Sequence, residues 1–160
     1  MESARRSRPA LRASAMPIDA VFSAANTAAL IGWIVLIAGP RSPLVSAALR
    51  HGLVLALSLL YAVFISAYFF EAEGAGYGDL AQVQAIFALP EAALAGWVHY
   101  LAFDLFVGLW IAAEADRRGL NRVVQTPILV ATFMFGPVGY LLFHAVLALP
   151  MRAAPKGEPS

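Results

Sequence analysis

The 160-residue chain is 61% hydrophobic and 13% charged, with 11 basic residues, 10 acidic residues and no cysteine. Such a composition is typical of a membrane protein rather than a soluble domain. The balanced charge offers no basic surface to nucleic acid, so no nucleic-acid partner is expected. Without cysteine, disulfides, thiol catalysis and thiolate metal sites are excluded. Phosphate-binding loops, dinucleotide fingerprints and the zinc-protease helix motif are also absent.

Three regions follow from the charge pattern. Residues 1–17 hold several arginines among small residues and proline, which predicts a disordered basic tail. Residues 18–149 are expected to form one transmembrane domain, and residues 150–160 a second disordered tail. The first tail resembles the start of a signal peptide, but the apolar run after it is too long, so a retained span is expected. Met16 remains an alternative start.

Four apolar runs predict the membrane spans. They cover residues 20–40, 52–70, 91–114 and 127–149, and prolines end or interrupt two of them. Within the fourth run, Gly136-Pro137-Val-Gly139 is expected to kink the helix. Between the second and third runs, an amphipathic piece around residues 80–89 favours a short interfacial helix. The predicted fold is an all-α membrane protein, a bundle of four transmembrane helices in up-down-up-down order. Lys and Arg divide almost evenly between its two ends, so no orientation is assigned.

The third run contains one certain charge between its terminal glutamates, Asp104. A carboxylate is costly in lipid, so it should face other protein, a cavity or a ligand. In a four-span bundle, several polar residues would share one half of the bilayer with it, open toward the N-terminal side. They are Asn26, Tyr68, Glu71, Glu91, His99 and His144.

A helical wheel separates the third span into two faces. One carries Trp97, Leu101, Asp104, Gly108 and Ile111, and the other His99, Phe103, Phe106 and Trp110. Asp104 and His99 therefore do not point at one centre, and Asp104 is expected to work with Asn26 or His144 from another span. Gly108 would admit a neighbouring backbone or a flat ligand.

Structural roles remain open beside these functional ones. Asp104 is equally explained by hydrogen bonds between helices, His99 by contact with lipid headgroups, and His144 by packing. The aromatic residues are commonly core or lipid-facing, and Trp33 and Trp97 fit an interfacial belt. The charged residues after the third span, Glu114 and Asp116 with three arginines, fit a solvated turn.

Two boxes give the chain a resemblance to a known family. Trp97-x-His99-x-x-x-Phe103-Asp104-Leu-Phe-x-Gly108-x-Trp110-Ile and Thr132-Phe-Met-Phe-Gly-Pro-Val-Gly139, with Pro127 between them, are similar to the abscisic-acid-deficient-four-like, or neoxanthin-synthase-like, membrane proteins. A further likeness in Phe22, Asn26, Gly32-Trp33 and Pro40 extends it to about residues 18–148. The resemblance implies four helices, no metal and no organic cofactor. The short tail is not a transit peptide, which favours a bacterial multi-pass inner-membrane protein.

The plant members are needed to turn violaxanthin into neoxanthin, an epoxide-to-allene isomerisation that requires an acid and a base. The resemblance therefore implies a cofactor-independent carotenoid isomerase. Its candidate catalytic residues are Asp104 as acid with His99 or His144 as base. The candidate ligand-binding residues, for a carotenoid or other polyene beside the membrane lipids, are Asn26, Trp97, Gly108, Trp110, Phe135 and Tyr140.

Two other functions stay open. The polar layer also fits a non-catalytic protein that binds lipid or assembles a membrane complex. A b-type haem between His99 and His144 is a third hypothesis, because the four-span topology places both at similar depth. The sequence assigns no oligomeric state.

Overall fold

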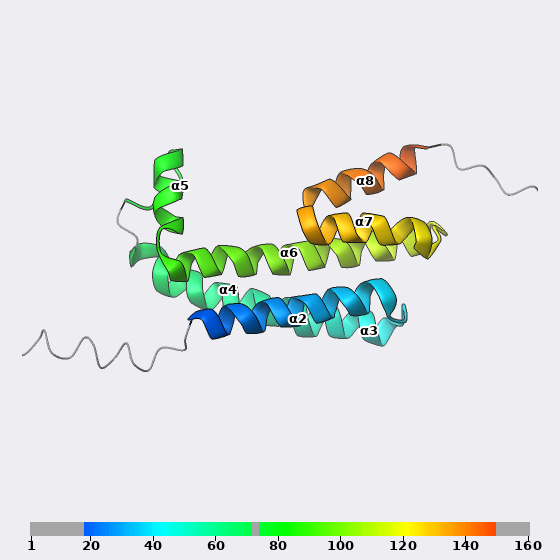
Figure 1. Ribbon diagram of the computed structural model, residues 1–160, viewed down its shortest axis with the longest axis horizontal. Helices are drawn as coiled ribbons and strands as arrows, with labels where there is room; N and C mark the ends of the chain where they lie inside the picture. Colours follow the sequence, from blue (N-terminus) through cyan, green and yellow to red (C-terminus); the bar gives the residue numbers. More distant parts are fainter. Residues whose placement is uncertain (1–17, 72–73, 150–160) are drawn as a thin grey trace, which may run out of the picture.

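A computed structural model describes residues 18–71 and 74–149. Within these ranges the chain forms helices joined by short loops, with no strand (Figure 1). The elements are α2 (Ile18–Ala38), α3 (Pro43–Ala47), a π-helical segment (Ala48–Val54), α4 (Leu55–Tyr68), a 3-10 turn (Phe69–Glu71), α5 (Leu80–Phe87), α6 (Pro90–Arg117), α7 (Arg122–Phe135) and α8 (Pro137–Ala148). The all-helical class is therefore confirmed.

Three helical stretches are long and apolar enough to cross a membrane: Ile18–Ala38, Pro43–Tyr68 and Pro90–Arg117. The second is continuous from α3 through the π-helical segment into α4. These stretches match the first three predicted spans. Each exceeds the roughly 20 residues that a helix needs to cross the hydrocarbon layer.

Helix α6 is the centre of the packing. It contacts α2, α4 and α7, and both buried apolar clusters include its side chains. One cluster joins Leu105 and Ile111 of α6 to Trp33 and Phe143, and the other joins Val98 to neighbours on α2 and α4. Every side chain on the buried face of α6 is therefore positioned by at least one neighbouring helix.

The predicted fourth span is wrong in form. Instead of one kinked helix, the run contains α7 and α8, two helices too short to qualify as spans by themselves. Helix α7 ends at Gly136, whose φ of 47° and ψ of −96° lie outside the helical region. A proline disfavours helical geometry at the residue before it, which here is Gly136. Only glycine adopts the backbone conformation found there at little cost. In Figure 1, α8 turns back toward the end of the molecule where α7 begins.

Close packing at Gly139 holds the α7–α8 hairpin together. A Cβ at this position would overlap the backbone and hydroxyl of Thr132 on α7. Thr132 itself is completely buried, and its hydroxyl donates to the Ile128 carbonyl at 2.8 Å. The two short helices therefore bury their facing sides against one another.

The hairpin changes where residues lie along the bundle. The start of α2, the end of α4 and the start of α6 share one end in Figure 1, as predicted, but the last turns of α8 point to the opposite end. His144 lies in α8 and therefore leaves the predicted common layer. Helix α5 confirms the short helix between the second and third spans, and it runs across the end of α6. The tails predicted for residues 1–17 and 150–160 lie outside the described residues.

The Gly139 contact predicts a selective loss of stability. Gly139→Ala should destabilise the protein by about 1–3 kcal/mol, because backbone atoms of Thr132 must move. Gly52→Ala is the matched control, since its new methyl group meets nothing within 4 Å. Thermal unfolding in detergent compares them. Equal unfolding temperatures for the two variants would show that this contact does not hold the hairpin.

The hairpin also predicts sidedness, and the natural chain has no cysteine to interfere. In sealed vesicles, an impermeant thiol reagent should reach Leu149→Cys and Arg117→Cys from the same side, and Glu71→Cys from the other. All three positions are exposed. A single fourth crossing would instead place residue 149 on the side of residue 71, and that labelling pattern would contradict the hairpin.

Candidate functional site

Asp104 lies about midway along α6 and faces the protein interior. Asp104 is only 9% exposed, and its Oδ2 is buried with no hydrogen-bond partner in the described part of the chain. Leu101, Gly108 and Ile111 from the predicted stripe are buried with it, whereas Trp97 of the same stripe is 42% exposed. Since α6 rises about 1.5 Å per residue, some 20 Å of helix lie on either side of the carboxylate. The acid is thus held deep within the bundle.

The tip of the α7–α8 hairpin covers this carboxylate. A Cβ built on Gly136 would lie 2.6 Å from Oδ1 and 3.1 Å from Oδ2 of Asp104. Gly136 therefore has two reasons to be glycine, its positive φ and the carboxylate against it. Pro137 begins α8 at the same place, so the positive end of that helix lies beside the acid.

Tyr100, one turn before Asp104, links the acid to the hairpin. Its hydroxyl lies 3.4 Å from the Phe133 carbonyl oxygen and 3.2 Å from that of Met134, as a donor to both, and it also interacts with the Asp104 carboxyl group. These carbonyls belong to the last turn of α7, where backbone carbonyls have no N–H partner within the helix. Sequence analysis missed Tyr100. The sequence did contain a signal for it: Tyr100 precedes Asp104 by four residues on the same helix, a spacing that makes two side chains neighbours.

Asn26 and Trp97 satisfy one another rather than Asp104. The Trp97 indole Nε1 donates to Asn26 Oδ1 at 3.0 Å, and Asn26 Nδ2 donates to the Phe22 carbonyl at 2.8 Å. Trp97 also stacks on Tyr100 with ring centroids 5.4 Å apart. A continuous set of contacts therefore runs from Asn26 through Trp97 and Tyr100 to Asp104, although Asn26 does not reach the acid directly.

The two candidate catalytic histidines do not touch Asp104. His99 lies on the exposed face of α6, stacked on Phe103 at 4.5 Å and against Tyr61 at 5.1 Å, close enough to Asp104 for an electrostatic interaction only. His144 packs on Tyr140 at 4.5 Å and lies near Trp110. The predicted pairing of Asp104 with Asn26 or His144 is therefore wrong. Tyr100 takes that place.

The separation of the histidines also removes the haem hypothesis. His144 packs near Trp110, which follows His99 by eleven residues on α6, or about 16 Å along the helix axis. An iron with two axial histidines needs both imidazoles on opposite sides of one atom. The depth assumed for His144 came from a fourth crossing that the hairpin replaces.

The candidate ligand-binding residues fall into an interior and an exposed group. Gly108 was predicted to admit a neighbouring backbone or a flat ligand, but the Trp33 indole occupies this place, and its ring would overlap a Cβ there. Trp33 is only 2% exposed, so its predicted place in an interfacial belt is wrong. Phe135, Tyr140 and Trp110 are exposed, and the last two pack together with ring centroids 5.7 Å apart. These exposed aromatic residues lie on α6, at the end of α7 and on α8.

The charged end of α6 is more ordered than predicted. Glu114 is buried and forms ion pairs with Arg117 and Arg118, so it does not belong to a fully solvated turn. Gln125 is also buried and donates to Asp116 Oδ1 and to the Leu120 carbonyl, both at 2.7 Å. Among the described residues, no group of three or more His, Cys, Asp or Glu side chains could hold a metal ion.

These elements define a class, a helical membrane protein with an acid at the centre of its longest helix. The chain belongs to the ABA4-like family, described as ABA DEFICIENT 4-like, whose model matches residues 20–143. The match begins two residues into α2, ends within α8 and includes every candidate site residue except His144. Comparison with curated proteins and with solved structures gives no match.

The Tyr100 contact predicts a local effect on the hairpin. Tyr100→Phe removes the hydroxyl that binds the α7 carbonyls, so it should cost about 1 kcal/mol and speed amide exchange around Gly136. Tyr77→Phe is the control, because Tyr77 is exposed, stacks on Phe69 and forms no hydrogen bond with the residues that the structure describes. Hydrogen exchange read by mass spectrometry measures the effect. Unchanged exchange in Tyr100→Phe would remove Tyr100 as the link to the hairpin.

Proposed function

We propose that this protein is a multi-pass membrane protein, neoxanthin-synthase-like, that binds an oxygenated carotenoid-like lipid and isomerises it with Asp104 as the acid. One observation carries the proposal: Asp104 is held deep in the bundle with one carboxyl oxygen unpartnered among the described residues, beside a hydroxyl and under the tip of the α7–α8 hairpin. Membership of the ABA4-like family supports the substrate class. A bacterial inner membrane is the proposed location.

An isomerisation needs no electron donor or acceptor, and its atoms balance within the substrate and one carboxyl group. Asp104 in its acid form protonates the epoxide oxygen as the carbon–oxygen bond breaks, giving a hydroxyl group and an electron-poor carbon. Loss of a proton from the adjacent polyene carbon then completes the allene. The resulting Asp104 carboxylate recovers a proton in that step, so the protein returns to its starting state.

The proposed base is thus the conjugate base of Asp104 itself. The sequence suggested His99 or His144, but both lie in aromatic groups away from the buried stripe. Two oxygens of one carboxyl group are suited to the task, because one can deliver a proton while the other receives one. Tyr100 serves as a positioning residue, since its hydroxyl interacts with Asp104 and holds the α7 end beside it.

A long apolar substrate also needs a surface along which to lie. The hairpin tip presents Met134, Phe135 and Tyr140 outward, and Trp110 of α6 continues this exposed surface. Aromatic rings and a thioether offer flat, polarizable contact to a polyene. We propose that the oxygenated ring enters between α6 and the hairpin tip while the polyene rests on this surface.

A non-catalytic role in lipid binding or in complex assembly is the second candidate. The observation that favours it is the Asn26–Trp97 hydrogen bond, in which polar side chains of two helices satisfy one another without a ligand. Under that hypothesis Asp104 stabilises the hairpin, and a carotenoid-like lipid is bound unchanged or not at all.

Expression in a host that accumulates violaxanthin, followed by pigment chromatography, separates the two candidates. Asp104→Asn should lower conversion at least about a hundredfold, because an amide does not donate its proton to an epoxide. Glu91→Gln is the matched control, an acid in the first turn of the same helix, and it should convert normally. Conversion by Asp104→Asn at the parent rate, with the protein present in equal amount, would contradict acid catalysis. Bound but unconverted pigment in the parent would favour the second candidate.

A further inference from the structure

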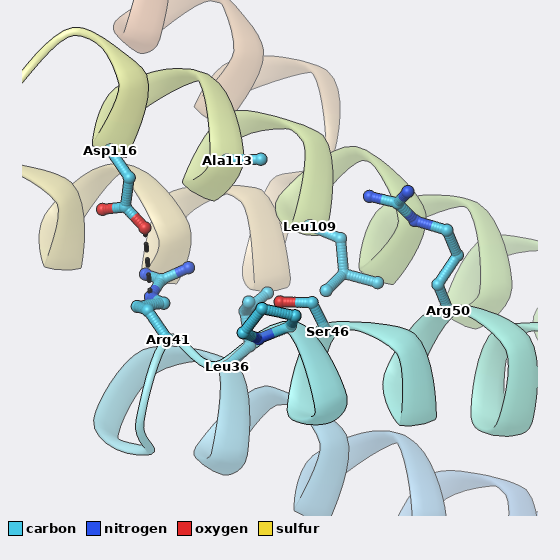
Figure 2. Close-up of a pocket in the computed structure, with 8 residues that line it drawn as sticks. Leu36, Arg41, Ser46, Arg50, Leu109, Ala113 and Asp116 are labelled. Atoms are coloured by element: carbon cyan, nitrogen blue, oxygen red, sulfur yellow. Dashed lines mark ion pairs between the residues drawn. The ribbon is translucent and has the colours of Figure 1, made fainter.

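A hollow with an excess of positive charge lies at the end of the bundle opposite α5. It occupies about 210 Å³ between the α2–α3 turn, the π-helical segment and α6. Figure 2 shows Arg41 and Arg50 at its two sides with Ser46 between them, and Asp116 and Ala113 above on α6. This hollow is distinct from the Asp104 site, because Asp104, Tyr100 and Gly136 are not among the residues that line it.

The charges around the hollow do not cancel. The Nε of Arg41 lies 3.9 Å from Asp116 Oδ2, the pair marked by the dashed line in Figure 2, while Nη2 of Arg41 donates to Gln125 at 3.1 Å. Arg50 has no ion pair or hydrogen bond with the described residues. Two guanidinium groups therefore face a single carboxylate, which leaves one positive charge without an internal partner.

Arg41 retains unused binding capacity despite its contacts. Its Nε is buried and makes no hydrogen bond within the described part of the chain. Burial lowers the pKa of this guanidinium, Asp116 raises it, and the nearby charge of Arg122 lowers it again. The positive charges thus repel one another across this end of the bundle, so an anion placed here gains from more than one arginine.

The position of Arg50 indicates what kind of anion this is. Arg50 lies seven residues beyond Pro43 in an apolar helix, so about 10 Å of helix separate it from the end. An arginine at this depth extends its guanidinium toward the headgroup layer. Apart from Ser46, Asp116 and the two arginines, the lining residues are apolar, including Leu109 and Ala113 of α6. Basic side chains above apolar walls, at the headgroup level between helices, match a phospholipid better than a free ion.

We propose that this hollow binds the phosphate of an anionic phospholipid, with Arg41 and Arg50 as its charged ligands and the Ser46 hydroxyl as a further donor. The planar guanidinium groups bind phosphate oxygens in pairs, and the lipid glycerol rests on Leu109 and Ala113. Asp116 holds Arg41 in place from the far side and faces the lipid's positive or neutral headgroup portion. The site is independent of the proposed isomerase function.

Binding is measured by native mass spectrometry of the delipidated protein with phosphatidylglycerol, phosphatidylcholine or inorganic phosphate. Phosphatidylglycerol should bind more tightly than phosphatidylcholine, and Arg50→Gln should weaken it at least about fivefold. Arg117→Gln is the control, an exposed arginine at the same end whose partner Glu114 retains Arg118, and it should bind as the parent does. Ala113→Leu, which fills the hollow without changing its charge, should also lose the lipid.

Three results would overturn the proposal. Unchanged binding in both Arg50→Gln and Ala113→Leu would remove the hollow as the site. An equal loss in Arg50→Gln and Arg117→Gln would show general attraction to a basic surface. Binding of inorganic phosphate as tight as that of phosphatidylglycerol would replace the lipid with a free anion as the ligand.

Discussion

A carboxylate halfway along an apolar helix has to be covered by protein, because its desolvation in lipid costs several kcal/mol. Asp104 imposes this requirement on the rest of the structure. Helix α6 turns its buried stripe toward α2 and α7, and the hairpin tip closes over the acid. The last turn of α7 leaves backbone carbonyls without helical partners, and the Phe133 and Met134 carbonyls share the hydrogen of the Tyr100 hydroxyl. The hairpin tip thus covers the Asp104 carboxyl group, and Tyr100 in turn binds the carbonyls that the tip leaves without helical partners.

The same centre connects the fold to the proposed chemistry. A helix broken in mid-membrane is tolerated only where its free backbone groups are buried in protein or line a cavity. Here the break lies against Asp104, the acid proposed to act on an oxygenated lipid, and Tyr100 and buried apolar side chains of α6 hold the hairpin beside it. The contacts that hold the tip are therefore also those that substrate entry would have to open. Stability and access would depend on the same residues.

Much of this arrangement followed from the sequence. Apolar length predicted the first three spans, α5 followed from its amphipathic spacing, and the wheel of α6 placed Asp104 inside with His99 and Trp110 outside. These features depend on one helix at a time. The fourth span did not follow, because Gly136-Pro137 is compatible with either a kink or a reversal. Which occurs depends on Thr132 against Gly139, a contact between separate turns. Because the hairpin was not predicted, the position of His144 and the role of Tyr100 were not predicted either.

The central claim is that the Asp104 carboxyl group lies against Gly136. Solid-state NMR in lipid bilayers tests it directly, in protein labelled with ¹³C at aspartate and glycine. The close approach of Gly136 to this carboxyl group predicts a cross-peak between the Asp104 side-chain carbon and the Gly136 Cα, and Asp104→Asn should abolish it. A carboxyl carbon that correlates with lipid acyl chains and not with Gly136 would contradict the account.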